Sequence, residues 1–592
     1  MFQNEKVMQT KTCPHCNSSF EITDKDLEFY EKVSPIFSGK KYLIPSPTLC
    51  PDCRQQRRLS FRNERKLYKR KCDATGKDII SIYSPDKPYK VYEQSYWWSD
   101  NWDPMDYGRD FDFSRSFFEQ FEELMKEVPK MSLSVEKQEN SEYSNYAGWN
   151  KDCYLIFLGA NNQNCYYCNG IWDSKNTIDS SFGRNNQNCY GLVNSNSNFN
   201  CFNLLNSNNC NNSYESKNLE SCEFCLFCDN LKNKRFFVLN KEVSKDEFEN
   251  ILSKYKSDLG FKKILIDKYS KLILPQKSNQ NLFSENVIGN YIKNSQNIYY
   301  GFDLDNVKDS KYVGWLFDSK NCYDVYDWGN TAENCYECHK VGNQVSNTYF
   351  SAFCLSNISN LLYCYDVVNN SSNCFGCVGL NNKQYCILNK QYTKEEYETL
   401  VPKIIEHMQK TGEWGEFFPS SISPFGYNET VAMEYFPITP PSIPPLSGEG
   451  SNMFQFSLSP VRGKMSKGQI GVLNRSTYEP PFPKVDKIIK ASMLPENISD
   501  IPDDILNWAI ECEVSAKPFR IVKAELEFYR KHNLPIPKRH PDQRHLDRLA
   551  LKNPRKLFER KCDKCGKDIK TTYSPDRNEI VYCEECYKKE VY

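Results

Sequence analysis

The sequence predicts a mainly β protein with some α-helix, built on a duplicated β-helix (solenoid) with helical caps and flanked by small domains at both ends. Two observations support this prediction. A motif of the form Asn-Cys-Tyr recurs every twelve residues between Asp152 and Cys228, and a second array of the same kind follows it. Short strands separated by Asn, Ser and Gly turns at a fixed small period are typical of a β-helix rather than a sandwich.

Composition limits the classes of protein to consider. The chain has 592 residues, enough for several domains, and its formal net charge is zero, so any attraction to nucleic acid or membranes must come from local patches. No run approaches the roughly 18 apolar residues of a membrane helix, and the first residues are too polar for a signal peptide. The 27 cysteines suit either a secreted disulfide scaffold or a zinc protein of the reducing cytosol. Paired Cys-x-x-Cys motifs favour the second, so we expect a cytoplasmic protein without membrane contact.

Residues 1–70 contain the first candidate metal site. Two Cys-x-x-Cys knuckles can present four thiolates tetrahedrally to Zn²⁺, because each tight knuckle aims both sulfurs at one point. The ligands predicted here are Cys13, Cys16, Cys50 and Cys53. Together with Phe20, Glu28-Phe29-Tyr30 and Arg54, this quartet resembles the treble-clef-like probable zinc-ribbon family over about fifty residues. The resemblance implies zinc binding and does not specify a partner.

A strongly basic stretch follows the second knuckle. Nine of the eighteen residues from Arg54 to Lys71 are basic and one is acidic, and the apolar spacing predicts a helix that begins at the knuckle. Such a surface could contact phosphates, or it could be a solvated helix face that keeps the ribbon soluble. The candidate nucleic-acid-binding residues in this stretch are Arg54, Arg57, Arg58, Arg62, Arg65 and Lys66.

Residues 71–135 begin with a copy of the C-terminal ribbon. Lys71 to Asp86 matches Lys561 to Asp576 at a constant offset of 490 positions. Where the C-terminal ribbon has four cysteines, this copy has Cys72, Thr75, Glu93 and Tyr96, so we expect it to be metal-free. An aromatic connector and an amphipathic helix over residues 113–128 complete the segment.

The two solenoids are expected over residues 140–260 and 285–412. Each ends in a capping-box motif, Ser244 with Glu247 and Thr393 with Glu396, which predicts a capping helix. Twelve residues could form one coil or half of a coil of about 24, and we favour the larger. Solenoid Cys-x-x-Cys pairs are expected to pack in ladders rather than bind metal, because residues three apart on a strand face opposite sides. These pairs are Cys165/Cys168, Cys225/Cys228, Cys335/Cys338 (followed by His339) and Cys374/Cys377.

The C-terminal part repeats the N-terminal part after a different segment. Residues 413–500 lack periodicity and are interpreted as an irregular linker with a low-complexity insertion near 440–477. Residues 501–560 form a degenerate ribbon, with Cys512, Ser515, His540 and Gln543 at the ligand positions. Residues 561–592 have a complete quartet for a second zinc: Cys562, Cys565, Cys583 and Cys586. Basic residues again precede this ribbon, and Arg544, Arg548, Arg555 and Lys556 join the nucleic-acid candidates.

No catalytic constellation stands out in the sequence. The six histidines do not pair with an obvious nucleophile and acid, and four-cysteine zinc sites are closed and structural. We therefore expect a non-enzymatic zinc-binding scaffold with about two structural Zn²⁺ ions, an unidentified macromolecular partner and no small-molecule substrate. The layout resembles uncharacterised zinc-ribbon proteins of candidate-phylum bacteria, which implies no activity. The alternatives are nucleic-acid binding, and a β-helix carbohydrate-active protein using Asp173, Asp179 and Arg184, or Asp324 and Asp327.

Overall fold

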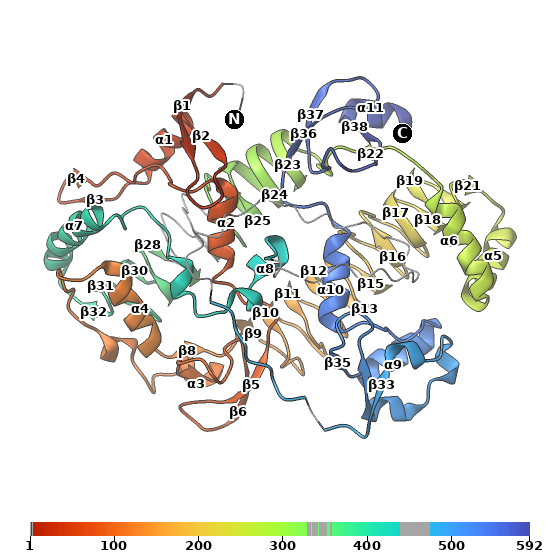
Figure 1. Cartoon of the computed structure of the whole chain (residues 1–592), viewed down its shortest axis with the longest axis horizontal. Helices are drawn as coiled ribbons and strands as arrows, with labels where there is room; N and C mark the ends of the chain where they lie inside the picture. The colour runs from red at the N-terminus through yellow and green to blue at the C-terminus, as the bar shows by residue number, and fades with distance from the viewer. Residues whose placement is uncertain are drawn as a thin grey trace.

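The computed structural model describes residues 2, 4–327, 329, 333, 341–342, 352–355, 358–438, 474–482 and 484–591. The predicted fold class is confirmed: most of the molecule is a β-solenoid, with helices at its ends and small domains at both termini. The first stack of coils runs from the centre of the molecule toward α5 and α6, and the second runs from β23 toward α7 (Figure 1).

The first stack is made of short parallel strands with a constant register. Phe202 pairs with Tyr214, and the next strand again pairs twelve residues on, Tyr214 with Leu226. The strands are β9 (Val135–Glu136), β10 (Asn145–Gly148), β11 (Phe157–Ala160), β12 (Asn169–Trp172), β13 (Lys175–Ile178), β14 (Ser181–Arg184), β15 (Gln187–Tyr190), β16 (Phe202–Leu205), β17 (Tyr214–Glu220), β18 (Glu223–Leu226), β19 (Asp229–Lys232) and β20 (Arg235–Val238). One coil therefore takes twelve residues, and the preference for a larger coil was wrong.

Each coil turns four corners, one every third residue. Corner residues such as Asn185, Asn188 and Asn194 have φ values between 49° and 54°, in the left-handed region. Asn reaches this conformation more easily than other residues with a side chain, which accounts for the abundance of Asn in the repeats. Because each corner interrupts strand alternation, every third side chain points inward. Both cysteines of a solenoid Cys-x-x-Cys pair, Cys225 and Cys228 for example, are buried in the core.

The solenoid interior is a set of stacked ladders. The Sγ atoms of the inner cysteines lie within hydrogen-bond reach of backbone carbonyls, as Cys201 does to the carbonyl of Cys210 at 3.3 Å. Buried Asn side chains bridge coils: the Oδ1 atom of Asn186 accepts from the backbone N–H of Asn198, twelve positions on. The predicted packing role of the cysteines agrees with these contacts, but the geometric reason given for it was wrong, since both members of a pair face inward.

The second stack repeats this design with less regular coils. Its registers step by 11 residues at the start, where Glu285 pairs with Gln296, and by 13 near the end, where Ser359 pairs with Ser372. Its strands are β23 (Glu285–Lys293), β24 (Gln296–Lys311), β25 (Gly314–Lys320), β26 (Val341–Gly342), β27 (Ala352–Leu355), β28 (Ser359–Leu362), β29 (Tyr365–Val368), β30 (Ser372–Phe375) and β31 (Gln384–Ile387). Cys335, Cys338 and His339 lie outside the described residues.

Both stacks end in the same way. A short antiparallel strand, β21 (Lys241–Glu242) or β32 (Lys390–Gln391), pairs with the last coil, and a helix follows. The Ser244 side chain caps α5 (Lys245–Ser257), which leads into α6 (Leu259–Ser270). Thr393 and Glu396 form the complete capping box of α7 (Lys394–Thr411). The two capping helices predicted from these motifs are therefore present.

The terminal domains form two matched pairs. The N-terminal pair contains β1 (Val7–Thr12), β2 (Ser19–Thr23), α1 (Asp24–Lys32), β3 (Ile36–Phe37), β4 (Lys40–Lys41) and α2 (Pro51–Leu59), then β5 (Tyr68–Lys71), β6 (Asp78–Ser81), β7 (Val91–Tyr92) and α3 (Gln94–Trp97). The C-terminal pair contains β33 (Lys487–Lys490), β34 (Trp508–Glu511), β35 (Pro518–Phe519), α9 (Lys523–His532) and α10 (Pro541–Ala550), then β36 (Phe558–Lys561), β37 (Asp568–Thr571), β38 (Val581–Tyr582) and α11 (Glu584–Val591).

The second ribbon of each pair extends the beginning of a solenoid. Strand β7 pairs in parallel with β8 (Lys130–Met131), which leads into the first stack. Strand β38, whose residues lie 490 positions after those of β7, pairs in parallel with β22 (Gln276–Lys277), which leads into the second stack. The two halves of the molecule are thus joined to their terminal domains by the same strand pairing.

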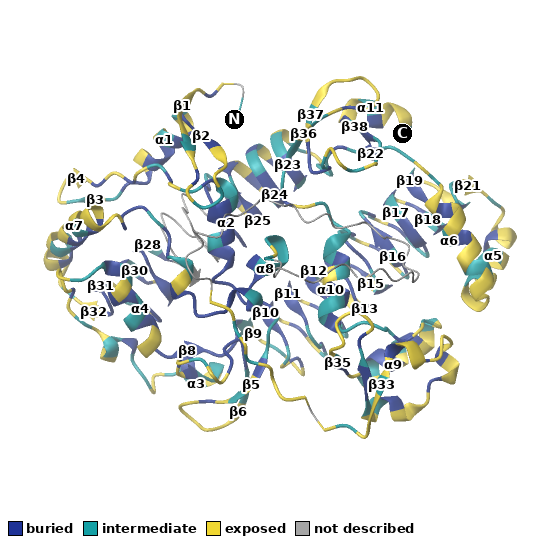
Figure 2. Cartoon of the chain, in the orientation of Figure 1, coloured by how far each residue is buried: buried dark blue, intermediate teal, exposed yellow. Residues whose placement is uncertain are grey.

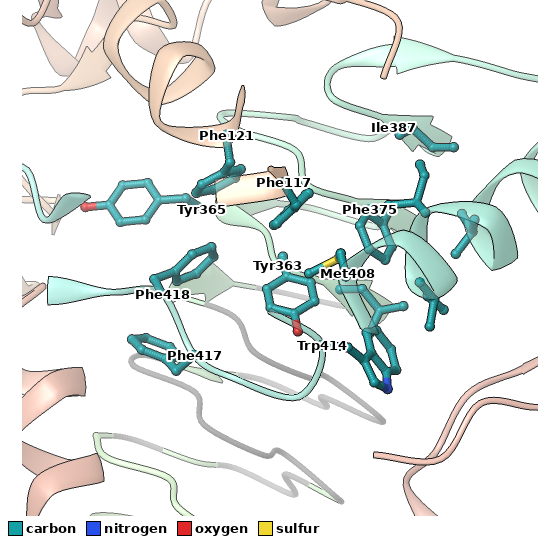
Figure 3. Packing of buried hydrophobic residues seen from close by; sticks show 14 of the residues in the cluster. Phe117, Phe121, Tyr363, Tyr365, Phe375, Ile387, Met408, Trp414, Phe417 and Phe418 are labelled. Carbon is teal, nitrogen blue, oxygen red and sulfur yellow. The ribbon is translucent and has the colours of Figure 1, made fainter. Parts of the chain in front are cut away.

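The largest apolar core joins segments that are far apart in the sequence. In α4 (Phe117–Glu127), Phe117 packs against Phe375 of the second stack, and Phe121 stacks on Phe418, which in turn contacts Phe417 (Figure 3). The last two residues belong to the segment expected to be an irregular linker. Residues 414–432, which lead into α8 (Val431–Tyr435), are largely buried rather than loose. Residues 439–473 of that segment lie outside the described residues.

Candidate metal centres

The first four-cysteine group forms as predicted. The Sγ atoms of Cys13, Cys16, Cys50 and Cys53 all lie within 4.8 Å of one another. Four sulfurs bound at about 2.3 Å to a tetrahedral zinc are separated by about 3.8 Å, so the group fits a zinc ion. The first knuckle is the turn of the β1–β2 hairpin, and the second is the start of α2. Zinc at this site would therefore join the hairpin to the helix.

The second group lies in the last ribbon. Cys562, Cys565, Cys583 and Cys586 also have their Sγ atoms within 4.8 Å of one another. Burial of the Cys562 thiol opposes its ionisation, but backbone N–H groups, that of Cys583 at 3.2 Å first among them, lower its pKa to about 6. Zinc binds the thiolate form of cysteine, so the lowered pKa favours the zinc-binding form of Cys562.

The two degenerate ribbons keep the knuckle backbone without the quartet. In all four ribbons the first cysteine's carbonyl accepts from the backbone N–H four residues on, at 2.8 to 3.0 Å. In the early copy, Cys72 Sγ accepts from the backbone N–H of Glu93, whose carboxylate pairs with Lys77. In the other, His540 Nδ1 accepts from the backbone N–H of Asp542 and caps α10. Among the described residues, only the two complete quartets form four-cysteine groups.

The ten residues predicted to contact nucleic acid are buried or half-buried. None is exposed, and Arg54, Arg58, Arg62, Arg544, Arg548 and Arg555 are buried. Figure 2 shows α2 as largely buried, whereas α5 and α11 expose most of their residues. Arg57 pairs with Glu416, Lys66 and Arg65 with Asp542, and Lys556 lies over the ring of Phe558. A phosphate backbone would have to displace these intramolecular partners.

The buried arginines fasten each terminal pair to a solenoid. Arg54 and Arg58, one helical turn apart on α2, both bind Asp324 of the second stack at 3.0 and 3.1 Å. Arg544 and Arg548, at positions 490 higher on α10, both bind Asp179 of the first stack. Each helix therefore inserts two guanidinium groups onto one carboxylate.

The aromatic surroundings of the two carboxylates also match. The guanidinium of Arg54 lies 5.1 Å from the ring centre of Tyr312, and that of Arg544 lies 4.3 Å from that of Tyr167. Tyr312 and Asp324 follow Tyr167 and Asp179 by 145 positions. We name these two assemblies the α2 clamp (Arg54, Arg58, Asp324, Tyr312) and the α10 clamp (Arg544, Arg548, Asp179, Tyr167).

The clamps were not predicted from the sequence. The arginines were expected to contact nucleic acid, and Asp179 and Asp324 to form a carbohydrate site, although all of them are buried in ion pairs. The offsets of 490 in the helices and 145 in the solenoids were a usable signal. Of the other carbohydrate candidates, Asp327 binds Arg62, while Asp173 and Arg184 are exposed on the first stack.

Each helix is followed by a short linker, residues 60–67 after α2 and residues 551–557 after α10, and both linkers contact the two stacks. Arg62 binds Asp327 of the second stack and faces the ring of Tyr146 of the first. At the corresponding position, Lys552 binds Asp303 of the second stack and faces the ring of Phe182 of the first. The linkers therefore hold the solenoids to each other as well as to the ribbons.

A cleft of about 2390 Å³ opens between these parts. Cys16 and Cys50 of the first quartet and residues 576–580 of the last ribbon contribute to its lining. His545 and Glu434 also line it, with His545 Nε2 3.1 Å from Glu434 Oε2, a pairing that no sequence motif predicts. Burial, with Arg65 nearby, lowers the pKa of His545 to about 4, so the imidazole is neutral at ordinary pH.

Among the described residues, no helix has the length and apolar character needed to cross a membrane. No protein-family model, curated protein or solved structure matches this chain.

Proposed function

We propose that this protein is a non-enzymatic, zinc-binding scaffold in which the double solenoid holds both terminal domain pairs in a fixed relation. The observation that supports this most is the pair of equivalent clamps. Each one buries two arginines on one solenoid carboxylate. Buried ion pairs are costly to open, because removal of one partner leaves an uncompensated charge in the interior. While it is closed, each clamp therefore holds its terminal pair in a fixed position on the solenoid.

We assign zinc to both four-cysteine groups, in a structural role. A closed tetrahedral thiolate site has no open position for substrate. Metal analysis of the protein purified without chelator should give about two zinc ions per chain. Cys562→Ser with Cys565→Ser should lower the count to one, as should Cys13→Ser with Cys16→Ser. A count near zero or near four in the parent protein would contradict this assignment.

The partner of the scaffold is proposed to be a macromolecule that binds an exposed solenoid face. Exposed ladders on the first stack include Trp149, Asn161, Asp173 and Asn185 at one corner of successive coils. Pull-down from the native cells, with and without nuclease, would identify the partner. A partner that survives nuclease treatment and is lost after Asn161→Arg with Asn185→Arg would support the proposal, and retention by the double variant would exclude this face.

Nucleic-acid binding remains the alternative prediction. If it holds, affinity should fall steeply with salt, and reversing the charges of Arg57 and Lys66, which are less buried than the clamp arginines, should weaken it. Binding that does not depend on salt, or that survives these reversals, would argue against the alternative.

A further inference from the structure

The two clamps differ at the N-terminus of their helices. Helix α2 begins at the first zinc site: Cys50 is its N-cap and makes no side-chain capping bond, Pro51 follows, and Cys53 lies in the first turn. Helix α10 begins at His540, whose Nδ1 accepts from the backbone N–H of Asp542 at 3.1 Å. One helix start therefore depends on metal ligands, and the other is capped by its own side chain.

The arginines of the α2 clamp follow the metal ligands directly. Arg54 is next to Cys53, and Arg58 is one turn further on. With zinc bound, Cys50 and Cys53 are held to the β1–β2 hairpin through Cys13 and Cys16, which fixes the first turn of α2. A fixed first turn fixes the direction in which both guanidinium groups point toward Asp324.

We propose that zinc at the Cys13/Cys16/Cys50/Cys53 site locks the α2 clamp, and that loss of this zinc releases α2 from the second stack while the α10 clamp stays closed. The inference rests on the proposed zinc binding of the first quartet. Release would bring Arg54, Arg58 and Arg62, now buried, to the surface, and would bare Asp324 and Tyr312 on the solenoid. The molecule would then have one permanent clamp and one metal-dependent clamp.

Hydrogen exchange of the full-length protein tests this directly. Zinc-loaded protein is compared with protein treated with a zinc chelator, and the buried amides of β16 and β17 serve as an internal standard of intact solenoid. Amides of residues 52–60 should exchange at least about tenfold faster after chelation, because local opening of α2 exposes them to solvent. Amides of residues 542–550 should change by less than about twofold. Equal loss in both helices, or no change in α2, would overturn the proposal.

Chelation also strips the last ribbon, so the two sites must be separated. Cys13→Ser with Cys16→Ser should reproduce the faster exchange of α2. Cys562→Ser with Cys565→Ser should leave α2 protected, although the last ribbon loses its metal. If the C-terminal variant frees α2 as well, the lock is not at the first site. Metal analysis of the same samples shows whether the first site holds zinc at all, which separates failure of the lock from failure of the zinc assignment.

The degenerate ribbon permits the reverse experiment. Ser515→Cys, His540→Cys and Gln543→Cys would complete a quartet with Cys512 on the retained knuckle backbone and would remove the cap of α10. Exchange of residues 541–550 should then become dependent on zinc, with about the same fold-change as α2 in the parent protein. If the variant binds a third zinc and α10 remains indifferent to chelation, the link between metal and clamp is refuted.

Discussion

The two terminal domain pairs share one architecture but differ in what stabilises them. The N-terminal pair has a complete cysteine quartet in its first ribbon and none in its second, and the C-terminal pair has the opposite arrangement. The second ribbons nevertheless share their strand pairing, all four ribbons share the knuckle backbone, and both α2 and α10 provide two clamp arginines. In the described residues, the ribbon fold and its docking are therefore maintained with or without a quartet. We propose that metal is needed only where no side chain takes its place, as His540 does at the start of α10.

The largest difference is expected between the last ribbon and its metal-free copy. Structural zinc contributes about 10–16 kcal/mol of apparent binding free energy in small zinc domains, so removal of zinc should unfold much of residues 561–592. Residues 71–98, with the same β-hairpin register, should be unaffected. Hydrogen exchange with and without chelator measures both segments in one sample. Loss of protection in residues 71–98 would show that the copy also depends on metal.

The clamp carboxylates should give the next largest effect. Asp324→Ala and Asp179→Ala each leave two buried arginines without their shared acceptor, which should cost about 3–5 kcal/mol of stability. The free energy of unfolding from urea titration measures the loss. Lys25→Ala, which breaks an exposed pair with Glu28, is the control and should have little effect. Similar values for the two aspartates would support equivalent clamps, and a difference of more than about 2 kcal/mol would not.

The backbone pattern of the molecule was more predictable from the sequence than the placement of its side chains. The repeat period, the caps at Ser244 and Thr393 and the Cys-x-x-Cys knuckles of both quartets follow from short-range sequence rules, because each depends on residues close together in the chain. The coil size did not follow, since a corner at every third residue is not deduced from strand alternation. The clamps did not follow either, because Arg54 and Asp324 are 270 positions apart and a basic run alone does not indicate burial.

Lys130 and Gln276 stand at equivalent places in the two halves, each in the strand that receives a second ribbon. Lys130 is buried, and its Nζ has no hydrogen-bond partner among the described residues, although it lies 5.0 Å from the ring centre of Tyr365. Burial lowers the pKa of Lys130 to about 8, although the nearby negative charge of Asp366 acts to raise it. Gln276 instead bonds Asn218 and the carbonyl of Leu274.

Because the folded-state pKa of Lys130 is below its unfolded value, the unfolded chain binds more protons between these values. Stability should therefore rise with pH from about 8 toward about 10, and the penalty should be complete below 8. Lys130→Gln, which copies the other half, should remove this rise and stabilise the protein at neutral pH by up to about 3 kcal/mol. Urea titrations from pH 7 to pH 10 on both proteins provide the measurement. An unchanged pH profile in the variant would mean that another group is responsible.

The smallest effect on stability is expected at a corner position that occurs in both stacks. Asn161 and Asn306, 145 positions apart, have φ values of 58° and 57°. Each donates from Nδ2 to the carboxylate of the next coil, Asp173 at 3.1 Å and Asp318 at 2.8 Å. Alanine at either position must adopt the left-handed region at a cost of about 1 kcal/mol or slightly more, and glycine should cost less.

Asn211→Ala is the matched control for these corner variants, because Asn211 lies on a coil side and makes a similar bond to Glu223. This substitution should lower the free energy of unfolding only by the contribution of that hydrogen bond, about 0.5 kcal/mol. If alanine at the corners costs no more than at Asn211, then hydrogen-bonded ladders, rather than backbone conformation, explain why Asn is so frequent. If glycine restores most of the loss at both Asn161 and Asn306, the corner geometry is the constraint that the two stacks share, even though their coil lengths differ.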